Sequence, residues 1–382
     1  MRAPPAWIVK PALAVRGAVG RAHTRMAPPF AVVVERTNAM MEGKALAVMA
    51  ELRIPDHLHA GPRSARELAA VVGANDDALD RLLAFLVACG LLGRTKDGRY
   101  ANNATSDVLR TDHPESVREW VRFIGAGWQW EIWNQLHHSV TTGESGTVAA
   151  HGKPYFEYVN DVNPEAGATF NQALAQLGVI MAPLVVDGYD FSRAARVCDV
   201  GGGSGILLAE VLQRHPAARG VLFELDALHT DARKALDARG VTDRCELVAG
   251  DFFASVPAGC DLYILQAIVH DWDDDRCVTI LDNVRQAMSP GARLLVIENM
   301  LDADGREKDK LTRGFDLLML VLTGAGRERT RAQFEALFAR AGLRLERDIT
   351  LPSLLHVLEL RVLEVRVLEV RATEEPARGA AG

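Results

Sequence analysis

A glycine-rich turn in the middle of the chain has residues that could hold a nucleotide-like ligand. An apolar run at 197–200 leads into this turn, and a helix is expected directly after it, at 206–213. The side chains and backbone positions that we single out are Asp199, Gly201, Gly203 and Gly205. Glycine has no Cβ atom, so the turn can bend sharply and a ligand can touch its backbone. Because Ile206 stands where the nicotinamide-dinucleotide pattern needs a small residue, the spacing suits S-adenosylmethionine (SAM) instead.

Two further segments downstream fit the same ligand. The apolar run 221–223 ends in Glu224, which is placed to bind ribose hydroxyls, and Leu225 follows it. After the next strand-like run, Asp251 and Phe252 supply an acid and an aromatic ring for an adenine. A tight strand-to-helix turn without a ligand is the alternative, but it leaves Glu224 and Asp251 unexplained. We therefore predict a SAM cleft.

His270 is the candidate general base. It follows the strand expected at 261–265, and ligands of doubly wound folds lie at the carboxyl ends of strands. Two acids could orient its imidazole: Glu298, at the end of the strand 293–298, and Glu328, just before a predicted helix. The alternatives are a loop histidine bonded to a neighbouring carboxylate, and acids that cap helices or are solvated.

Three consecutive aspartates, 273–275, resemble a metal site at first sight. Consecutive carboxylates point apart, so we expect them to cap the following helix and complement its dipole. We see no convincing set of metal ligands elsewhere and predict no metal.

The carboxyl-terminal half alternates strands and helices, which predicts a Rossmann-like, doubly wound α/β domain. The expected strands are 196–200, 220–224, 245–248, 261–265, 293–298, 343–348 and 354–361. Residues 31–185 look mostly helical, and a helix, helix, hairpin order between residues 64 and 101 is typical of a winged helix. A DNA-binding regulator is therefore an alternative. The second of these helices opposes it, because that helix begins with acids and Arg81 is its only basic residue.

Composition limits the class of protein and its surroundings. The 382 residues leave room for two domains, and 48% of them are hydrophobic. The net charge of −7 argues against nonspecific nucleic-acid binding, and we read no membrane span in the sequence. Five cysteines without a C-x-x-C motif suit a reduced, cytoplasmic protein. We divide the chain into a disordered extension at 1–25, a helical winged-helix-like domain at 26–185, a SAM-binding domain at 186–361 and a tail at 362–382.

The tail carries a short repeat. Three near-copies of one pentad occupy residues 357–371, and we expect the first copy to be an edge strand and the others a local duplication. Residues 372–382 read as disordered.

The motifs occur together in an order that resembles a known family. The glycine turn, Glu224, the segments 250–252 and 270–272, and the run 326–330 are similar to the SAM-dependent O-methyltransferases of the caffeate and acetylserotonin type, with bacterial relatives in aromatic polyketide and antibiotic biosynthesis. The resemblance covers about residues 30–361. It implies a class I methyltransferase fold, and a homodimer formed through the N-terminal domain, which would keep its winged-helix shape without binding DNA.

The resemblance also implies a reaction and its residues. The substrate would be the phenolic or enolic hydroxyl of a small aromatic metabolite, with His270 as the base beside Glu298 and Glu328. Gly201, Glu224, Asp251 and Phe252 would hold SAM, which becomes S-adenosylhomocysteine. Gln266 would contact the amino-acid end of SAM, at a position where the family often has Lys. Glu224 stands where Asp is commoner. Some relatives keep SAM but hydroxylate or decarboxylate their substrate, which leaves a second possible activity.

Overall fold

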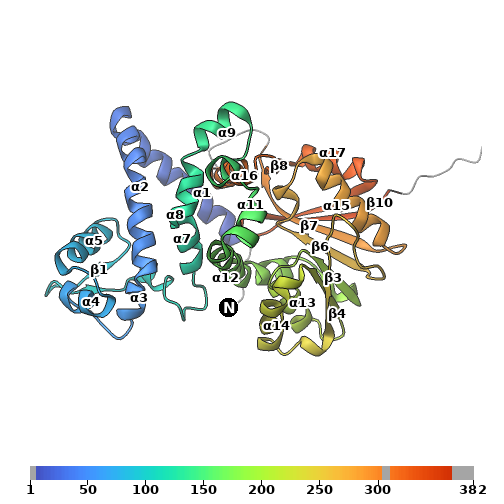
Figure 1. Cartoon of the computed structure of the whole chain (residues 1–382), viewed down its shortest axis with the longest axis horizontal. Helices are drawn as coiled ribbons and strands as arrows, with labels where there is room; N and C mark the ends of the chain where they lie inside the picture. Colours follow the sequence, from blue (N-terminus) through green and yellow to red (C-terminus); the bar gives the residue numbers. More distant parts are fainter. Residues whose placement is uncertain (1–5, 303–309, 364–382) are drawn as a thin grey trace, which may run out of the picture.

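The computed structural model describes residues 6–302 and 310–363, and its carboxyl-terminal part is built on one mixed sheet (Figure 1). The strand order is β5-β4-β3-β6-β7-β10-β9, and β8 pairs with the end of β7. The strands are β3 (Arg196–Val200), β4 (Arg219–Glu224), β5 (Cys245–Ala249), β6 (Leu262–Gln266), β7 (Arg293–Leu301), β8 (Arg329–Thr330), β9 (Leu343–Thr350) and β10 (Leu355–Val362). All seven predicted strands are present, and no end is shifted by more than three residues.

The order of the last strands corrects one expectation. β10 runs antiparallel between β7 and β9, so the first pentad is an interior strand and the prediction of an edge strand was wrong; β9 forms the edge. Val357, Leu358 and Leu360 are fully buried, because β10 is covered on both faces. The second and third pentads lie mostly outside the described residues, as does the rest of the tail.

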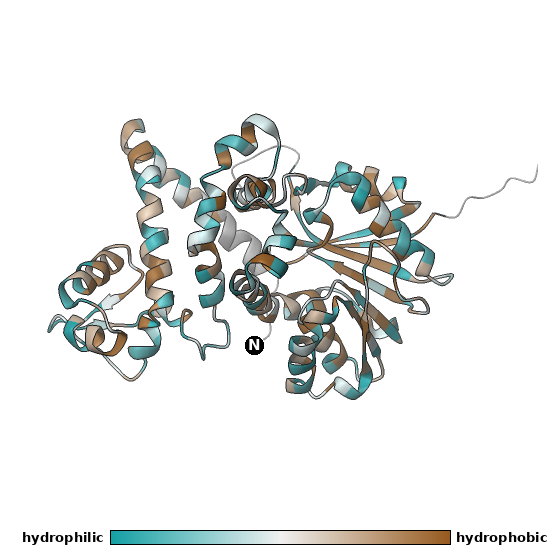
Figure 2. Cartoon of the chain, in the orientation of Figure 1, coloured by the Kyte–Doolittle hydropathy of each residue, from teal (hydrophilic) through white to brown (hydrophobic). Residues whose placement is uncertain are grey.

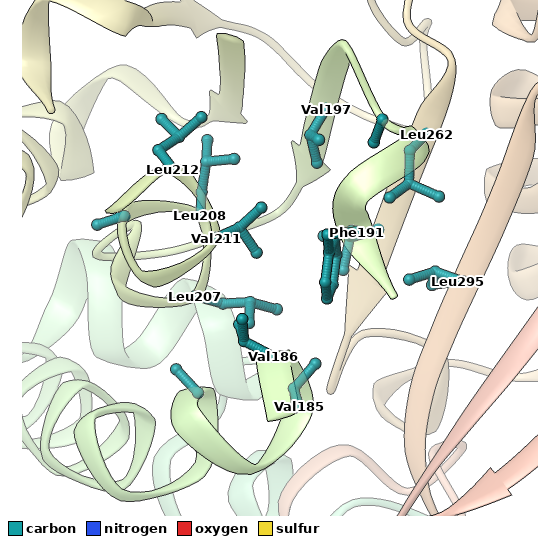
Figure 3. Close-up of a cluster of buried hydrophobic side chains, with 14 of the residues drawn as sticks. Val185, Val186, Phe191, Val197, Leu207, Leu208, Val211, Leu212, Leu262 and Leu295 are labelled. Atoms are coloured by element: carbon teal, nitrogen blue, oxygen red, sulfur yellow. The ribbon is translucent and has the colours of Figure 1, made fainter. Parts of the chain in front are cut away.

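Helices cover both faces of the sheet, as a doubly wound fold requires. On one face α12 (Pro164–Gly188), α13 (Ile206–Arg214) and α14 (His229–Ala238) pack on Val197, Leu262 and Leu295 (Figure 3). On the other face α15 (Asp274–Ala287) and α17 (Arg331–Arg340) pack on the alternate strand residues. Figure 2 shows that the strands between these layers are coloured mostly as hydrophobic. Because β5, β4, β3, β6 and β7 pair in parallel, their carboxyl ends lie at the same edge of the sheet.

The N-terminal part is helical and contains the expected helix, helix, hairpin arrangement. Its elements are α1 (Ala6–Met26), α2 (Pro29–Glu51), α3 (Ile54–His57), α4 (Ala65–Val72), α5 (Asp76–Ala88), β1 (Gly93–Arg94), β2 (Tyr100–Ala101) and α6 (Ala104–Asp107). Ser64 and Glu67 form a capping box at the start of α4. The structure differs from the expectation of disorder at 1–25, because α1 occupies most of that segment. Its alanines favour a helix, a propensity that we gave too little weight.

A third group of helices lies between the winged-helix-like part and the sheet (Figure 1). It consists of α7 (Arg118–Gly125), α8 (Gly127–Trp133), α9 (Leu136–Thr142), α10 (Gly146–His151), α11 (Tyr155–Glu157) and α16 (Lys310–Thr323). Aromatic rings join these helices: Trp120 packs on Phe315, and Phe123 on Trp128 and Phe170. Among the described helices, only α12 is long and apolar enough to cross a membrane, judged by length and composition. We interpret α12 as a core helix, because it packs against both α7 and α13.

Candidate functional site

The histidine that we expected to act as a base lies in a short turn after β6. The strand ends at Gln266, Ala267 has a left-handed backbone with φ of 53°, and residues Val269–Asp271 form a single 3₁₀ turn. A positive φ is costly for a residue with a side chain, so the surroundings must hold this bend in place. The His270 side chain is about one-sixth exposed, which leaves part of the ring open to a ligand.

Glu298 supports this turn from the neighbouring strand. It ends the buried run of β7 and is 1% exposed. Its Oε1 accepts backbone N–H groups of Ile268 at 3.1 Å and Val269 at 2.8 Å, and its Oε2 lies 3.4 Å from His270 Nδ1. One carboxylate thus holds both the backbone and the ring of the turn, which also covers the capping role that we had kept as an alternative.

Glu328 approaches the same ring nitrogen from another segment. It is 2% exposed, and its Oε1 lies 3.3 Å from His270 Nδ1 and accepts a hydrogen bond from Asn299 at 3.3 Å. Its backbone N–H donates to Asp316. The structure therefore brings together the three side chains that the sequence separates by up to 58 residues. Both acids face Nδ1, so Nε2 is the nitrogen left for a substrate.

The acids around the imidazole change its proton affinity. Burial alone would lower the pKa of His270, but the negative charges of Glu298, Asp271 and Glu328 outweigh it and raise this pKa to about 10. Burial raises the pKa of Glu298 to about 7 and that of Asp271 to about 6. The cluster therefore favours an imidazolium next to carboxylates, one of which binds a proton near neutral pH.

Asp271 and Tyr155, neither of which was predicted to have a role, also belong to this region. Asp271 Oδ1 lies 3.6 Å from His270 Nε2, on the side where a substrate would bind. Tyr155 is 2% exposed, and its hydroxyl has no hydrogen-bond partner within the described ranges. Asp271 could have been inferred from its place next to His270, whereas nothing local in the sequence marks Tyr155.

The glycine turn lies beside this histidine turn. Gly201, Gly203 and Gly205 have φ values of 69°, 55° and 70°, a conformation that favours glycine. A Cβ atom on Gly201 would come within 2.7 Å of Ile268 and 3.4 Å of Phe252, whereas one on Gly203 would meet nothing within 4 Å. The turn is thus closely packed at Gly201 and open at Gly203. At Gly201 it therefore contacts both the histidine turn and Phe252, the aromatic residue expected near adenine.

Glu224 lies at the end of β4, next to the glycine turn. Its Oε2 accepts the N–H of Gly203 at 2.9 Å, and its Oε1 accepts the N–H of Leu225 at 2.7 Å. Leu225 itself is 48% exposed. A carboxylate held by two N–H groups keeps lone pairs for hydroxyl donors, so it can both brace the turn and bind a diol.

Asp199 is the most unusual acid of the region. It is 1% exposed, and in the part of the chain that the structure describes neither carboxylate oxygen has a hydrogen-bond partner. Burial and the charge of Glu224 raise the pKa of Asp199 to about 7. A Cβ atom on Gly202 would lie 2.5 Å from Asp199 Oδ2, so the carboxylate lies directly under the turn.

The other predicted contacts line the adjoining strand ends. Asp251 Oδ1 accepts the N–H of Phe253 at 2.8 Å, and Asn283 donates to the carbonyls of Phe252 and Phe253, at 2.9 Å each. Gln266 ends β6 opposite Ile297 of β7.

Asp273 caps α15 through the N–H of Arg276, as predicted. Within the described residues, one group has ligand atoms near enough to hold a metal ion: His270, Glu298 and Glu328, within 4.8 Å of one another.

Comparison with known proteins places the chain in a family. The O-methyltransferase domain family matches residues 133–344, and the O-methyltransferase dimerisation domain family matches residues 34–112. The mitomycin biosynthesis 6-O-methyltransferase of Streptomyces lavendulae is 41% identical over 327 residues, which cover 84% of this chain and 91% of that protein.

Solved structures agree with this result. The mitomycin 7-O-methyltransferase MmcR is 38% identical, with a TM-score of 0.80 over 90% of this chain and 99% of that one. The O-methyltransferase NcsB1 from neocarzinostatin biosynthesis, in complex with SAM and 2-hydroxy-5-methyl naphthoic acid, is 33% identical, with a TM-score of 0.72 over 84% and 96%. The resemblance and the fold class inferred from the sequence are confirmed: this chain belongs to the O-methyltransferase family, with a class I methyltransferase fold and an N-terminal dimerisation domain.

Proposed function

We propose that the protein transfers the methyl group of SAM to a phenolic or enolic hydroxyl of an aromatic secondary metabolite, with His270 as the general base. The observation that carries this proposal is the position of the His270 imidazole. Its Nδ1 lies 3.3–3.4 Å from two buried carboxylates, and it lies two residues from Ile268, which packs against the glycine turn. A base placed beside a cofactor cleft suits proton removal during methyl transfer.

The residues around the glycine turn fit SAM. SAM supplies an activated methyl group on a sulfonium. The open backbone at Gly203 would face the amino-acid end of this cofactor, and the buried Asp199 carboxylate below it lacks a donor partner. Glu224 would accept hydrogen bonds from the ribose diol. The other proposed contacts are Gly201, Gly205, Leu225, Asp251, Phe252 and Gln266.

The raised pKa of His270 suits a phenolic substrate. A free phenol has a pKa of about 10 and a free imidazole about 6.5, so proton transfer would cost about 5 kcal/mol. With the pKa of His270 raised to about 10, the two groups match and the transfer step itself costs little, so at neutral pH the cost lies in freeing the base. The imidazole must first lose its own proton to solvent. It then accepts the hydroxyl proton at Nε2, while Glu298 and Glu328 stabilise the cation from the Nδ1 side.

We infer that the active form is a homodimer. Large apolar side chains of α2 are half-exposed or more in the isolated chain: Phe30, Val33, Val34, Met40 and Met41. A second copy of the chain would cover them, since α2 enters the segment that matches the dimerisation family. We retain residues 26–185 as the dimerisation and substrate-lid domain and 186–361 as the SAM-binding domain of a cytoplasmic enzyme that uses no metal and binds no nucleic acid.

The test is incubation with methyl-labelled SAM and a panel of phenolic polyketides, flavonoids and indoles. In a parallel incubation with unlabelled SAM, a product heavier by about 14 Da reports one methyl group, whereas about 16 Da would report one oxygen and favour the hydroxylase alternative. A decarboxylated product would be lighter. His270→Gln serves as the matched variant, and the exposed Asp231→Asn on α14 serves as the control. If His270→Gln transfers the label as fast as wild type does, the role of His270 as base is contradicted.

A further inference from the structure

The turn that carries His270 is held by a second buried side chain. Arg329 is 1% exposed and lies directly after Glu328. Its Nη1 donates to the carbonyl of Val269 at 2.8 Å, and its Nη2 donates to the carbonyl of Trp272 at 2.9 Å. These two carbonyls lie on either side of His270 and Asp271, so one guanidinium spans the catalytic turn.

The far side of the guanidinium is also fixed. Its Nε and Nη2 donate to Asp274 Oδ1, at 3.1 and 2.7 Å. Asp274 is half exposed and compensates a charge that is otherwise buried. The planar guanidinium makes these four hydrogen bonds in fixed directions, beside longer ones to the Arg327 carbonyl and Cys277 Sγ, and charge-assisted bonds of this kind are stronger than neutral ones.

The two sides of the turn are held by different segments. Glu298 accepts the N–H groups of Ile268 and Val269, whereas Arg329 donates to carbonyls. The N–H of Arg327 donates to the carbonyl of His270 at 2.8 Å. Three consecutive residues, 327–329, therefore contact the carbonyl of His270, its ring and the carbonyls on either side of it. This arrangement can maintain the unfavourable backbone of Ala267.

We propose that Arg329 is a positioning residue for the methyl transfer: it holds the turn so that the His270 ring stays against Glu298 and Glu328 while Nε2 faces the acceptor. This inference rests on the proposed role of His270 as base. It goes further because it names Arg329, which does not contact the substrate, as the residue that holds the base in position. A small displacement of a reacting group can cost about 100-fold in rate, so the effect should be measurable.

The ionisable groups around His270 determine how its pKa would respond to a looser turn. Glu298 from β7, Asp271 within the turn and Glu328 before β8 face the ring. Asp316 of α16 and Tyr155 of α11 lie further out, and Arg329 and Asp274 lie behind the turn. A ring that moves away from Glu298 and Glu328 loses their stabilisation of the imidazolium. Its pKa should then fall toward that of free histidine.

The experiment compares Arg329→Lys with Arg331→Lys. Lysine keeps the charge but concentrates its donors on one atom, so it cannot span both carbonyls and Asp274. Arg331 is half exposed and pairs with Glu335 and Asp348, so it is a control for the same substitution two residues away. NMR titration of the imidazole, assigned as the resonance missing in His270→Gln, needs no substrate and reads the ring directly.

In Arg329→Lys we expect the His270 midpoint to fall by about one pH unit or more. We expect kcat to fall by roughly 10- to 100-fold and SAM affinity to stay within about twofold. Asp274→Asn leaves both carbonyl bonds in place and should shift the midpoint in the same direction by less; it keeps the test available if Arg329→Lys does not fold. Arg331→Lys should behave as wild type.

The proposal would be overturned if Arg329→Lys folds, its His270 midpoint is unchanged, and its kcat falls only in step with its thermal stability. Arg329 would then be a purely structural residue. An unchanged midpoint in Asp274→Asn, should Arg329→Lys not fold, would do the same. Wild-type turnover in His270→Gln would instead overturn the proposed base. The two failures are therefore distinguishable.

Discussion

His270 Nδ1 lies 3.3 Å from Glu328 Oε1, although 58 residues separate them in the sequence. Because Glu298 Oε2 also lies 3.4 Å from the same nitrogen, the ring presents Nε2 to a ligand. This relationship determines which ring nitrogen takes the proton of the substrate and how strongly the imidazole holds that proton. The first two predictions follow from it.

Replacing the base should slow turnover without weakening cofactor binding. His270→Gln keeps much of the volume but cannot accept a proton, and general-base catalysis contributes roughly 10²–10⁴-fold. We expect kcat to fall by about that factor, with a smaller loss at high pH, where solvent supplies phenolate. Glu328→Gln should lose less, because the base remains and only its cation is less stabilised. Steady-state kinetics and SAM calorimetry on both variants provide the measurement; a matching loss of SAM affinity would point to a disrupted cleft.

The pH dependence should be strongly alkaline. The carboxylates raise the pKa of His270 to about 10, so the free enzyme holds an imidazolium at neutral pH and only a small fraction can accept a proton. We expect kcat/KM to rise about tenfold per pH unit from about pH 7 to about pH 9. In Glu328→Gln the bend should move to lower pH, because one negative charge is lost. A wild-type profile that bends near pH 6.5 would contradict the raised pKa.

Loss of the Glu224 carboxylate should weaken SAM binding. Each hydrogen bond to a charged group is worth roughly 1.5–3 kcal/mol, so Glu224→Ala should cost tenfold or more in affinity by calorimetry. The effect includes a looser turn, because Glu224 also accepts the N–H of Gly203. Glu224→Gln retains an acceptor oxygen and should lose less. Equal affinity in Glu224→Ala and wild type would place the cofactor elsewhere.

Asp199 should make the protein without cofactor less stable as pH rises. Its pKa is about 7 in the folded protein and about 3.9 when unfolded, so the native state holds an extra proton between these values. The stability that this proton provides is complete below about pH 4 and is lost as pH rises through about 7. We therefore expect Asp199→Asn to gain stability relative to wild type between pH 5 and about pH 8, measured by urea unfolding. The exposed Asp231→Asn is the control, and a difference that does not change with pH would contradict the argument.

The extra pentads should be dispensable, but the cut must respect β10. Val362 pairs with Leu343, and the N–H of Leu363 donates to Gly342. Truncation after Leu363 should leave the melting temperature and activity close to those of the full chain. Truncation after Leu354 removes β10 and should abolish folding. A large loss from the first cut would show that the later pentads contribute to the sheet or to the dimer.

Sequence patterns predicted the parts of the fold that depend on local chemistry. The parallel strands β3, β4 and β6 are short continuous runs of buried residues, and Asp273 has the position and side chain of a cap, so both could be inferred from neighbours in the chain. The site residues could be proposed because strand ends of a parallel sheet meet at one edge. These predictions needed only periodicity, caps and the order of strands.

Features that depend on distant partners were missed. An edge strand and an interior strand can share one apolar pattern, so the place of β10 was not visible in its pentad. The helix α1 was obscured by prolines and basic residues near the start of the chain. The contacts of Arg329 with the carbonyls of Val269 and Trp272 join residues up to 60 positions apart, and an arginine before a helix normally suggests only a solvated charge.

The interior place of β10 also bears on how the chain reaches its native state. Glu298 lies opposite His356 in the antiparallel pairing of β7 with β10, so the strand that carries this acid gains its neighbour only from the last described segment. During synthesis, the helical N-terminal domain and the parallel strands emerge first, but β7 stays open on one side until β10 arrives. A nascent chain could therefore fold its cofactor cleft while it still lacked a settled base. The ability to deprotonate a substrate would be acquired only after β10 has joined the sheet.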